Sequence, residues 1–260
     1  MKAVLRGDAG EGLAVVYVPG IDGTGALLLG LEARLEARYR LVRLGYDAGE
    51  DVPDTYADLA ATIAAVVRAR GIERCLVLAE SFGGAVALQL ALDHAGLVAG
   101  LMIVNSFAYY AERGRLALAQ GLAPLVPGAL FALGRRWFAP SQLFGEREDP
   151  QARAAFQAQP GSFFDEGYER RMQMIRGLDL RSRLGEVLQP VALYAGDADR
   201  VVPSVESLEI LRRGLPDATL EVLPGGGHLV LPLAEEPWPE RVADLARRAG
   251  LPGGGTGSRE

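Results

Sequence analysis

Short apolar runs alternate along this chain with longer segments that mix apolar and polar residues. The short runs are typical of strands buried on both faces, and the mixed segments have the spacing of helices that cover them. The predicted strands are 13–18, 39–44, 75–80, 99–105, 190–195 and 219–223. The predicted helices are 26–37, 54–70, 82–94, 204–214 and 235–248. This order predicts an α/β fold, with a mostly parallel sheet and helices on both faces.

The alternation stops between the fourth and fifth predicted strands. Residues 107–185 show no strand pattern and are rich in aromatic residues, leucine and proline, so we expect a helical cap inserted there. Such an insertion would lie over the carboxyl ends of the strands, where open α/β sheets bind ligands. The expected organisation is an α/β core of residues 1–106 and 186–249 and a helical cap of residues 107–185. Residues 250–260 are rich in glycine and polar, and we expect a disordered tail.

One segment of the cap raises the question of a membrane. Residues 116–134 carry no charge and have roughly the length of a membrane span. They also contain Pro124, Pro127 and three glycines, and arginines flank both ends. This pattern favours two short apolar helices, with transient contact to a membrane surface, over a true span.

Composition narrows the classes of function. The 260 residues carry a net charge of −6, which argues against nucleic acid as a partner. One cysteine permits no internal disulfide, and with two histidines it makes a structural zinc site improbable. We expect neither a metal nor a cofactor. The apolar run at the N-terminus is too short for a secretion signal, so a cytoplasmic protein is expected; the oligomeric state stays open.

The most informative motif is Ala79-Glu80-Ser81-Phe82-Gly83-Gly84, which joins the third predicted strand to an Ala- and Leu-rich helix. A serine at such a sharp strand-to-helix turn has its hydroxyl exposed above the sheet, which is the geometry of a nucleophile. The pattern G-x-S-x-G is met except at Ala79. The alternative is an ordinary turn that contains a serine. We expect the side chain of Glu80 to leave the sheet end for solvent.

A nucleophilic serine needs a base, and histidine titrates in the right range. His94 is at the far end of the helix that begins at the serine, so His228, after three glycines and the last strand, is the base by elimination. The glycine run would let the imidazole swing over the serine. Asp197 and Asp199 both follow the fifth strand; Asp199 is favoured as the acid that orients His228, and Asp197 as a turn residue.

The chain resembles the α/β-hydrolase superfamily over nearly its whole length. The signatures are the glycine loop P-G-I-D-G-T-G at 19–25, the serine turn, G-D-x-D-x-x-V-P at 196–203, and the late Gly-His, in the order Ser, Asp, His of that family. The loop and E-S-F-G-G also resemble a subgroup of esterase, lipase and thioesterase-like proteins and phytyl-ester or acyltransferase relatives. The resemblance implies an oxyanion hole from the backbone N–H groups of Ile21 and Phe82, with Asp22 in contact with substrate. Family members often have His-Gly where this chain has Pro19-Gly20.

These observations predict a serine hydrolase that cleaves carboxylic esters with apolar acyl chains through an acyl-enzyme. The substrate would be a small-molecule or lipid ester, and the aromatic residues Tyr109, Trp137 and Phe138 of the cap are expected to line its pocket. An acyltransferase or a thioesterase would use the same triad. A ligand-binding protein without catalytic activity is the remaining alternative.

Overall fold

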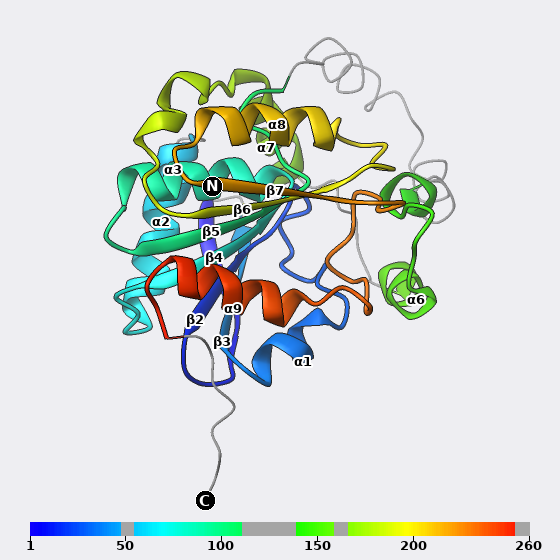
Figure 1. Ribbon diagram of the computed structural model, residues 1–260, viewed down its shortest axis with the longest axis horizontal. Coiled ribbons are helices and arrows are strands. Elements are labelled where there is room, and N and C mark those ends of the chain that lie inside the picture. The colour runs from blue at the N-terminus through cyan, green and yellow to red at the C-terminus, as the bar shows by residue number, and fades with distance from the viewer. Residues whose placement is uncertain (48–54, 111–138, 159–165, 253–260) are drawn as a thin grey trace, which may run out of the picture.

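A seven-stranded sheet forms the centre of the molecule (Figure 1). The computed structural model describes residues 1–47, 55–110, 139–158 and 166–252. The strands are β1 (Lys2–Ala9), β2 (Ala14–Val18), β3 (Arg40–Asp47), β4 (Cys75–Glu80), β5 (Val98–Val104), β6 (Val191–Gly196) and β7 (Ala218–Leu223). Their order is β1-β3-β2-β4-β5-β6-β7, and every neighbouring pair from β3 to β7 is parallel. The predicted α/β class is confirmed.

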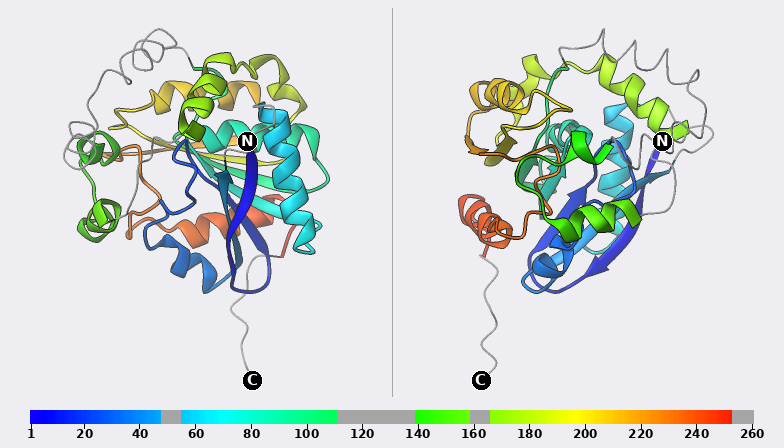
Figure 2. Two further views of the ribbon diagram at one scale, coloured as in Figure 1. Left: turned by 180° about the vertical axis from the view of Figure 1, so that it is seen from behind. Right: turned by 90° about the vertical axis from the view of Figure 1, so that its right-hand side faces the viewer.

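Strand β1 is the element that the apolar pattern did not reveal. It pairs antiparallel with β3 at the edge of the sheet, and the N–H of Ala3 donates to the hydroxyl of Thr62 at 3.0 Å. Figure 2 shows this strand beside the helix that carries Thr62. Because an edge strand is covered incompletely, β1 mixes buried and exposed positions and lacks the continuous apolar run of a central strand.

Helices cover both faces of the sheet, as predicted (Figure 1). One layer holds α2 (Tyr56–Ala69), α3 (Phe82–Asp93) and α8 (Ser204–Gly214), and the other holds α1 (Leu31–Glu36) and α9 (Trp238–Arg248). Successive residues of the central strands enter opposite layers: Val16 packs in one apolar cluster, whereas Val15 and Tyr17 pack in the other. The sheet is therefore buried on both faces, which explains why its strands read as unbroken apolar runs.

Two predicted helix starts are wrong. The helix expected from residue 26 begins at Leu31, because Leu29 and Gly30 have positive φ angles of 47° and 105°. Helix α2 is capped by Thr55, whose side chain accepts the N–H of Asp58, and residue 54, the first of the predicted helix, lies outside the described residues. Helix α9 begins at Trp238 and not at residue 235. The helices themselves are present.

The regular elements named between β5 and β6 are helices. They are α6 (Pro150–Ala158), α7 (Glu166–Gly177) and the short 3₁₀ helix η2 (Arg181–Glu186). Much of the expected cap, including residues 116–134, lies outside the described residues, so its boundaries stay a prediction. Within the described ranges, no helix is long and apolar enough to cross a bilayer.

The chain continues in ordered contact beyond α9. The N–H of Leu251 donates to the carbonyl of Ala246 at 2.9 Å, and the Leu251 side chain packs against the cluster that contains Trp238. The predicted tail therefore starts too early at residue 250. Residues 253–260 lie outside the described part.

Close backbone packing fixes the start of α3 against the sheet. A Cβ atom added to Gly83 would lie 2.4 Å from the carbonyl oxygen of Val18 and 2.5 Å from that of Pro19. No side chain fits between these groups. The glycine after the serine turn is thus required because the helix passes directly over the end of β2.

We expect Gly83→Ala to destabilise the fold by about 1–3 kcal/mol, because the added methyl group collides with backbone that is not free to rotate away. Thermal unfolding followed by circular dichroism should show a Tm lowered by about 2–12 °C. Gly96→Ala is the matched control, since nothing lies within 4 Å of its added Cβ. Equal Tm values for the two variants would contradict the packing argument.

Candidate active site

Ser81 occupies the sharp turn between β4 and α3. Its backbone has φ 53° and ψ −126°, a conformation that costs a non-glycine residue about 1–3 kcal/mol. The turn is held by its neighbours: the N–H of Ser81 donates to Val104 at 2.9 Å, and the hydroxyl of Ser106 donates to the Ser81 carbonyl at 2.6 Å. A Cβ on Gly84 would meet that Ser106 oxygen at 2.2 Å. Strain at this residue is thus maintained by the surrounding structure, as expected of a functional turn.

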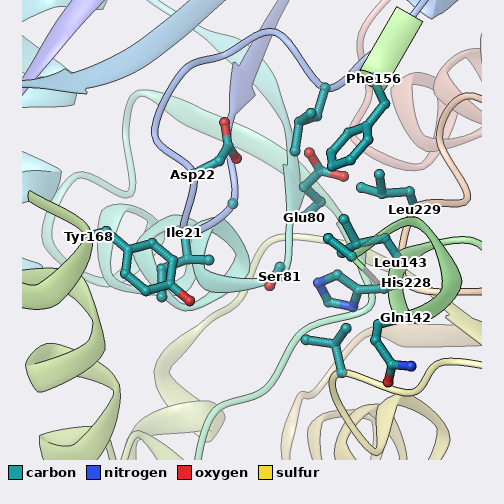
Figure 3. A pocket seen from close by; sticks show the side chains of 14 residues that line it. Ile21, Asp22, Glu80, Ser81, Gln142, Leu143, Phe156, Tyr168, His228 and Leu229 are labelled. Atoms are coloured by element: carbon teal, nitrogen blue, oxygen red, sulfur yellow. The ribbon is translucent and has the colours of Figure 1, made fainter. Parts of the chain in front are cut away.

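Asp199 and His228 form a buried pair at the carboxyl end of the sheet. Asp199 lies in the loop after β6 and His228 in the loop after β7, and Nδ1 of the imidazole is 2.8 Å from Oδ2 of the carboxylate. The two side chains are only 1% and 7% exposed, respectively. With Nδ1 used in this contact, Nε2 is the ring nitrogen left to face the pocket. Figure 3 shows the imidazole beside Ser81.

Three further donors hold the carboxylate of Asp199. The N–H groups of Val201 and Val202 donate to Oδ1 at 2.8 and 3.1 Å, and the hydroxyl of Ser204 donates to Oδ2 at 2.5 Å. Ser204 is the first residue of α8, and its hydroxyl binds Asp199 instead of capping the helix. Burial alone would raise the pKa of Asp199, but the charge of His228 and these hydrogen bonds outweigh it, so the pKa is lowered.

The same pair raises the pKa of His228 above its ordinary value. Burial is the largest single influence and would lower this pKa, because it disfavours the imidazolium. The charge and hydrogen bond of Asp199, with the charge of Glu80 in addition, more than offset that influence. The imidazole is thus a stronger base than a solvated histidine while its other nitrogen stays available.

Gly226 and Gly227, directly before His228, are closely packed against their neighbours, which corrects the expectation that a flexible run would let the imidazole swing. A Cβ on Gly227 would lie 2.2 Å from the backbone nitrogen of Gly145, and one on Gly196 would lie 2.4 Å from the oxygen of Gly226. The carbonyl of Gly225 accepts two further N–H groups from residues 146 and 147. The loop is therefore fixed between two other loops.

Asn105 also belongs to the site, although no motif in the sequence marks it. Its Nδ2 donates to the carbonyls of Gly227 and His228 at 2.9 and 2.8 Å, and its Oδ1 accepts the N–H of Gly196 at 2.7 Å. The side chain is fully buried and the residue has a positive φ of 46°. One amide thus ties together the loops that carry Asp199 and His228.

Asp197 and His94 were not chosen as the acid and the base, and their positions agree with the roles predicted for them. Asp197 accepts the N–H of Gly225 at 2.7 Å and so supports the loop backbone, although the donor comes from a neighbouring loop and not from its own. His94 is the residue that ends α3, at the far end of the helix from Ser81.

The turn Gly20-Ile21-Asp22 lies against the serine. A Cβ on Gly20 would be 3.5 Å from Cβ of Ser81. Phe82 is the first residue of α3, so its N–H precedes the helical hydrogen bonds, and like the turn it adjoins Ser81. Ile21 and Phe82, the residues predicted to supply the oxyanion donors, are thus both neighbours of Ser81.

A buried arginine from α7 supports that turn. Arg171 is 1% exposed, and its Nε donates to the carbonyl of Ile21 at 2.6 Å while Nη2 lies 3.4 Å from that of Asp22. The guanidinium also lies 5.8 Å from the ring centroid of Tyr46, and a Cβ on Gly23 would meet it at 3.0 Å. The glycine loop is therefore folded around a side chain that sequence gave no reason to single out.

Ser81 and His228 open into one cavity of about 280 Å³ (Figure 3). The side chains lining it are mostly apolar. Its described lining residues are Gly20, Ile21, Asp22, Leu27, Glu80, Ser81, Ala139, Gln142, Leu143, Phe156, Tyr168, Val201, His228 and Leu229. No group of histidine, cysteine or acidic side chains among the described residues could hold a metal.

Of the residues predicted to contact the substrate, one lines the cavity in the described part of the structure. Asp22 does line the cavity. Tyr109 is not among the described lining residues: it bridges to Asp179, and the guanidinium of Arg181 lies 3.9 Å from its ring centroid. Trp137 and Phe138 lie outside the described residues. Tyr168 and Phe156, which the sequence analysis did not select, contribute aromatic rings to the cavity.

Glu80 does not leave for solvent, and that expectation is wrong. Its residue is 3% exposed, it lines the cavity, and its Oε1 accepts the hydroxyl of Tyr17 on the adjacent strand β2. Burial raises the pKa of Glu80 to about 7, while the Tyr17 hydrogen bond and the charge of His228 limit the rise. A carboxyl group that titrates near neutrality thus lies next to Ser81.

We expect His228 to titrate above 6.5, the ordinary value for histidine, because Asp199 stabilises its imidazolium. NMR titration of the imidazole carbon-bound protons can show this, with His94→Gln used to assign the two histidines of the chain. Asp199→Asn should lower the pKa of His228, because the amide removes the charge but keeps the shape. An unchanged pKa in that variant would contradict the proposed coupling.

Comparison with known proteins agrees with this geometry. The family model described as "Alpha/beta hydrolase family" matches residues 15–245. A relative named "Putative carbamate hydrolase RutD", from Variovorax paradoxus, is 30% identical, and the alignment covers 94% of this chain and 95% of the relative. A hydrolase from Pseudomonas aeruginosa has a similar structure, with a TM-score of 0.71, 24% identity and coverage of 96% and 94% of the two chains. An esterase from Exiguobacterium antarcticum has a TM-score of 0.73 at 21% identity and covers 95% of each chain. The chain therefore belongs to the α/β hydrolase family and is a hydrolase.

Proposed function

We propose that this hydrolase cleaves carboxylic esters, with Ser81 as nucleophile, His228 as base and Asp199 as the acid that orients it. The observation that carries the proposal is the buried contact between His228 and Asp199 in the wall of the cavity that contains Ser81. Because Asp199 holds Nδ1, the imidazole is kept in the tautomer that leaves Nε2 free to accept a proton.

In the proposed reaction, Nε2 of His228 takes the hydroxyl proton as the serine oxygen attacks the ester carbonyl. The tetrahedral intermediate collapses with cleavage of the bond to the alkoxy group, which leaves as an alcohol after His228 returns the proton. Water then attacks the acyl-serine with the same base, which releases the acid and restores the serine. Asp199 stays ionised throughout, because its pKa is held low.

The negative oxygen of each intermediate would be stabilised by the N–H groups of Ile21 and Phe82. The support is positional: the Gly20-Ile21 turn contacts Ser81, and Phe82 begins α3 directly after it. Arg171 fixes the turn through the Ile21 carbonyl, so the donor needs no reorganisation during the reaction.

The shape and lining of the cavity favour an acyl group of a few carbons. Leucine, isoleucine, valine and phenylalanine side chains line it, and a volume of about 280 Å³ suits a small ligand. Each buried methylene adds about 0.8 kcal/mol to binding in such a site. The segment over the cavity would be the helical cap of residues 107–185.

Carbamate hydrolysis is the second candidate, because the relative that is 30% identical is named for it. A carbamate carries nitrogen on the carbonyl that the serine attacks, and the same three side chains would serve. Acyl transfer and thioester cleavage also use this arrangement and differ in the acceptor or the leaving atom.

A fluorophosphonate probe should label the wild-type protein once, at Ser81, because only an activated serine displaces fluoride from phosphorus at a useful rate. Intact-mass analysis should show one adduct, and Ser81→Ala should show none. Asp199→Asn should be labelled more slowly by at least about tenfold, whereas Asp197→Asn, which changes the same group two residues away, should keep the wild-type rate. Wild-type protein that takes up no probe would refute the nucleophile.

We expect kcat/KM for p-nitrophenyl esters to rise from acetate to butyrate by several-fold, mainly through a lower KM, as methylenes fill the apolar cavity. A matched p-nitrophenyl carbamate, assayed for steady turnover and for a burst, separates the second candidate from the first. Acetate as the clearly preferred ester would contradict the apolar pocket, and steady turnover of the carbamate with none of any ester would favour carbamate hydrolysis.

A further inference from the structure

The carboxyl group of Glu80 has one oxygen anchored and one open. Oε1 accepts the hydroxyl of Tyr17, which is itself fully buried in β2. Oε2 of Glu80 has no hydrogen-bond partner among the residues that the structure describes, and the residue as a whole is only 3% exposed. The residue lines the cavity that contains Ser81, and Figure 3 shows its carboxyl group between Asp22 and Phe156.

The surroundings of this oxygen are apolar. Leu27, Phe156 and Leu229 line the same cavity and belong to one apolar cluster. Oε2 of Glu80 is not one of the buried side-chain atoms that lack a hydrogen-bond partner, so it is open to the cavity that the residue lines. A bound ligand would displace water from this oxygen, and a hydrogen-bond donor on the ligand would replace the bond that is lost. The open oxygen is therefore a recognition element that the ligand can complete.

The number of hydrogen-bond donors on a ligand group decides whether that group fits beside Oε2 of Glu80. An ammonium group has three N–H donors to satisfy, whereas a hydroxyl has one. The other acidic group of the cavity offers little help: Oδ2 of Asp22 accepts from Thr24, and Oδ1 is covered from solvent and cavity alike. One open oxygen in an apolar wall therefore matches a single neutral donor.

We propose that Glu80 and Tyr17 form a polar subsite beside Ser81 that recognises a hydroxyl group on the acyl chain of the substrate. This inference rests on the proposed ester hydrolysis and specifies its substrate class, short hydroxyacyl esters. Tyr17 fixes the orientation of the carboxyl group, so that its second oxygen is presented to the acyl chain. The hydroxyl donates to Oε2 while the ester carbonyl lies at Ser81.

The ionised form of Glu80 is the better acceptor, which gives the subsite a pH dependence. Burial raises the pKa of this group to about 7. The titratable groups that act on it are Tyr17 and His228, which favour the ionised form, and Asp22, which opposes it. Preference for the hydroxyl should consequently be strongest above pH 7 and weaken below it, as Oε2 acquires a proton and can donate to a carbonyl as well.

The test compares methyl 3-hydroxybutanoate with methyl 3-oxobutanoate, using methyl butanoate as reference. The two esters have the same chain, and only the first has a donor at the third carbon. At pH 8.5 we expect the wild-type kcat/KM to favour the hydroxy ester by about tenfold, the order expected for one hydrogen bond to a charged group. A ratio of rates cancels the titration of His228, which affects both esters equally.

Glu80→Gln should invert this preference. The Tyr17 hydroxyl donates to the amide oxygen, which leaves the NH₂ group facing the cavity as a donor for the 3-oxo group. Fluorophosphonate labelling of Ser81 in the same variant reports whether the nucleophile is intact. Should the variant fail to fold, the wild-type ratio measured at pH 8.5 and pH 5.5 is the remaining test, and it is expected to fall with pH.

Each outcome decides the matter. A wild-type ratio near one at pH 8.5 would overturn the subsite, as would a ratio that is the same in Glu80→Gln and unchanged by pH. Inversion in the variant with a fall in the wild-type ratio at low pH would support it. Failure of the proposed function looks different, because the wild-type protein would then hydrolyse none of the three esters and leave Ser81 unlabelled.

Discussion

The buried hydrogen bond between Asp199 and His228 is the interaction on which the site depends. Burial disfavours the charged form of both groups. Each charge stabilises the other, so the pKa of Asp199 is lowered and the pKa of His228 is raised. The contact requires two loops, from β6 and β7, to meet within 2.8 Å, and Asn105 at the end of β5 bonds to the backbone of both. Three neighbouring parallel strands, β5, β6 and β7, therefore hold this pair in place, and the sheet supplies its rigidity.

Close approach of backbone to backbone is the second constraint. Around Ser81, the helix passes so near to β2 and the Ser106 side chain that Gly83 and Gly84 have no room for a Cβ. Around His228, Gly196 and Gly227 meet other loops in the same way. Glycine at these places is set by contact distance, with the result that the strained serine and the buried imidazole are held without loose loops.

Two buried charged side chains support the residues around Ser81. Arg171 extends from α7 into the glycine loop and holds the Ile21 carbonyl, and Glu80 lies at the end of β4, next to β2, with Tyr17 as its anchor. Both side chains are almost fully buried. Since a buried ion is costly without partners, each is tied to a specific part of the site: the arginine to the carbonyl of Ile21, and the carboxyl group to the hydroxyl of Tyr17.

The sequence by itself determined the features that arise from neighbouring residues or from elimination. The run 75–80 followed by Ser81 and small residues predicted β4, the turn and α3, because apolar periodicity and glycine spacing act locally. The choice of His228 followed because the other histidine ends the helix that starts at the serine. Only the tertiary structure decided the roles of Glu80 and Asn105, whose partners lie 63 and 122–123 residues away. It likewise revealed β1, which is a strand because β3 offers it an edge, and Arg171, whose position depends on where α7 docks. Burial and long-range hydrogen bonding are properties of the packed chain, and no local pattern encodes them.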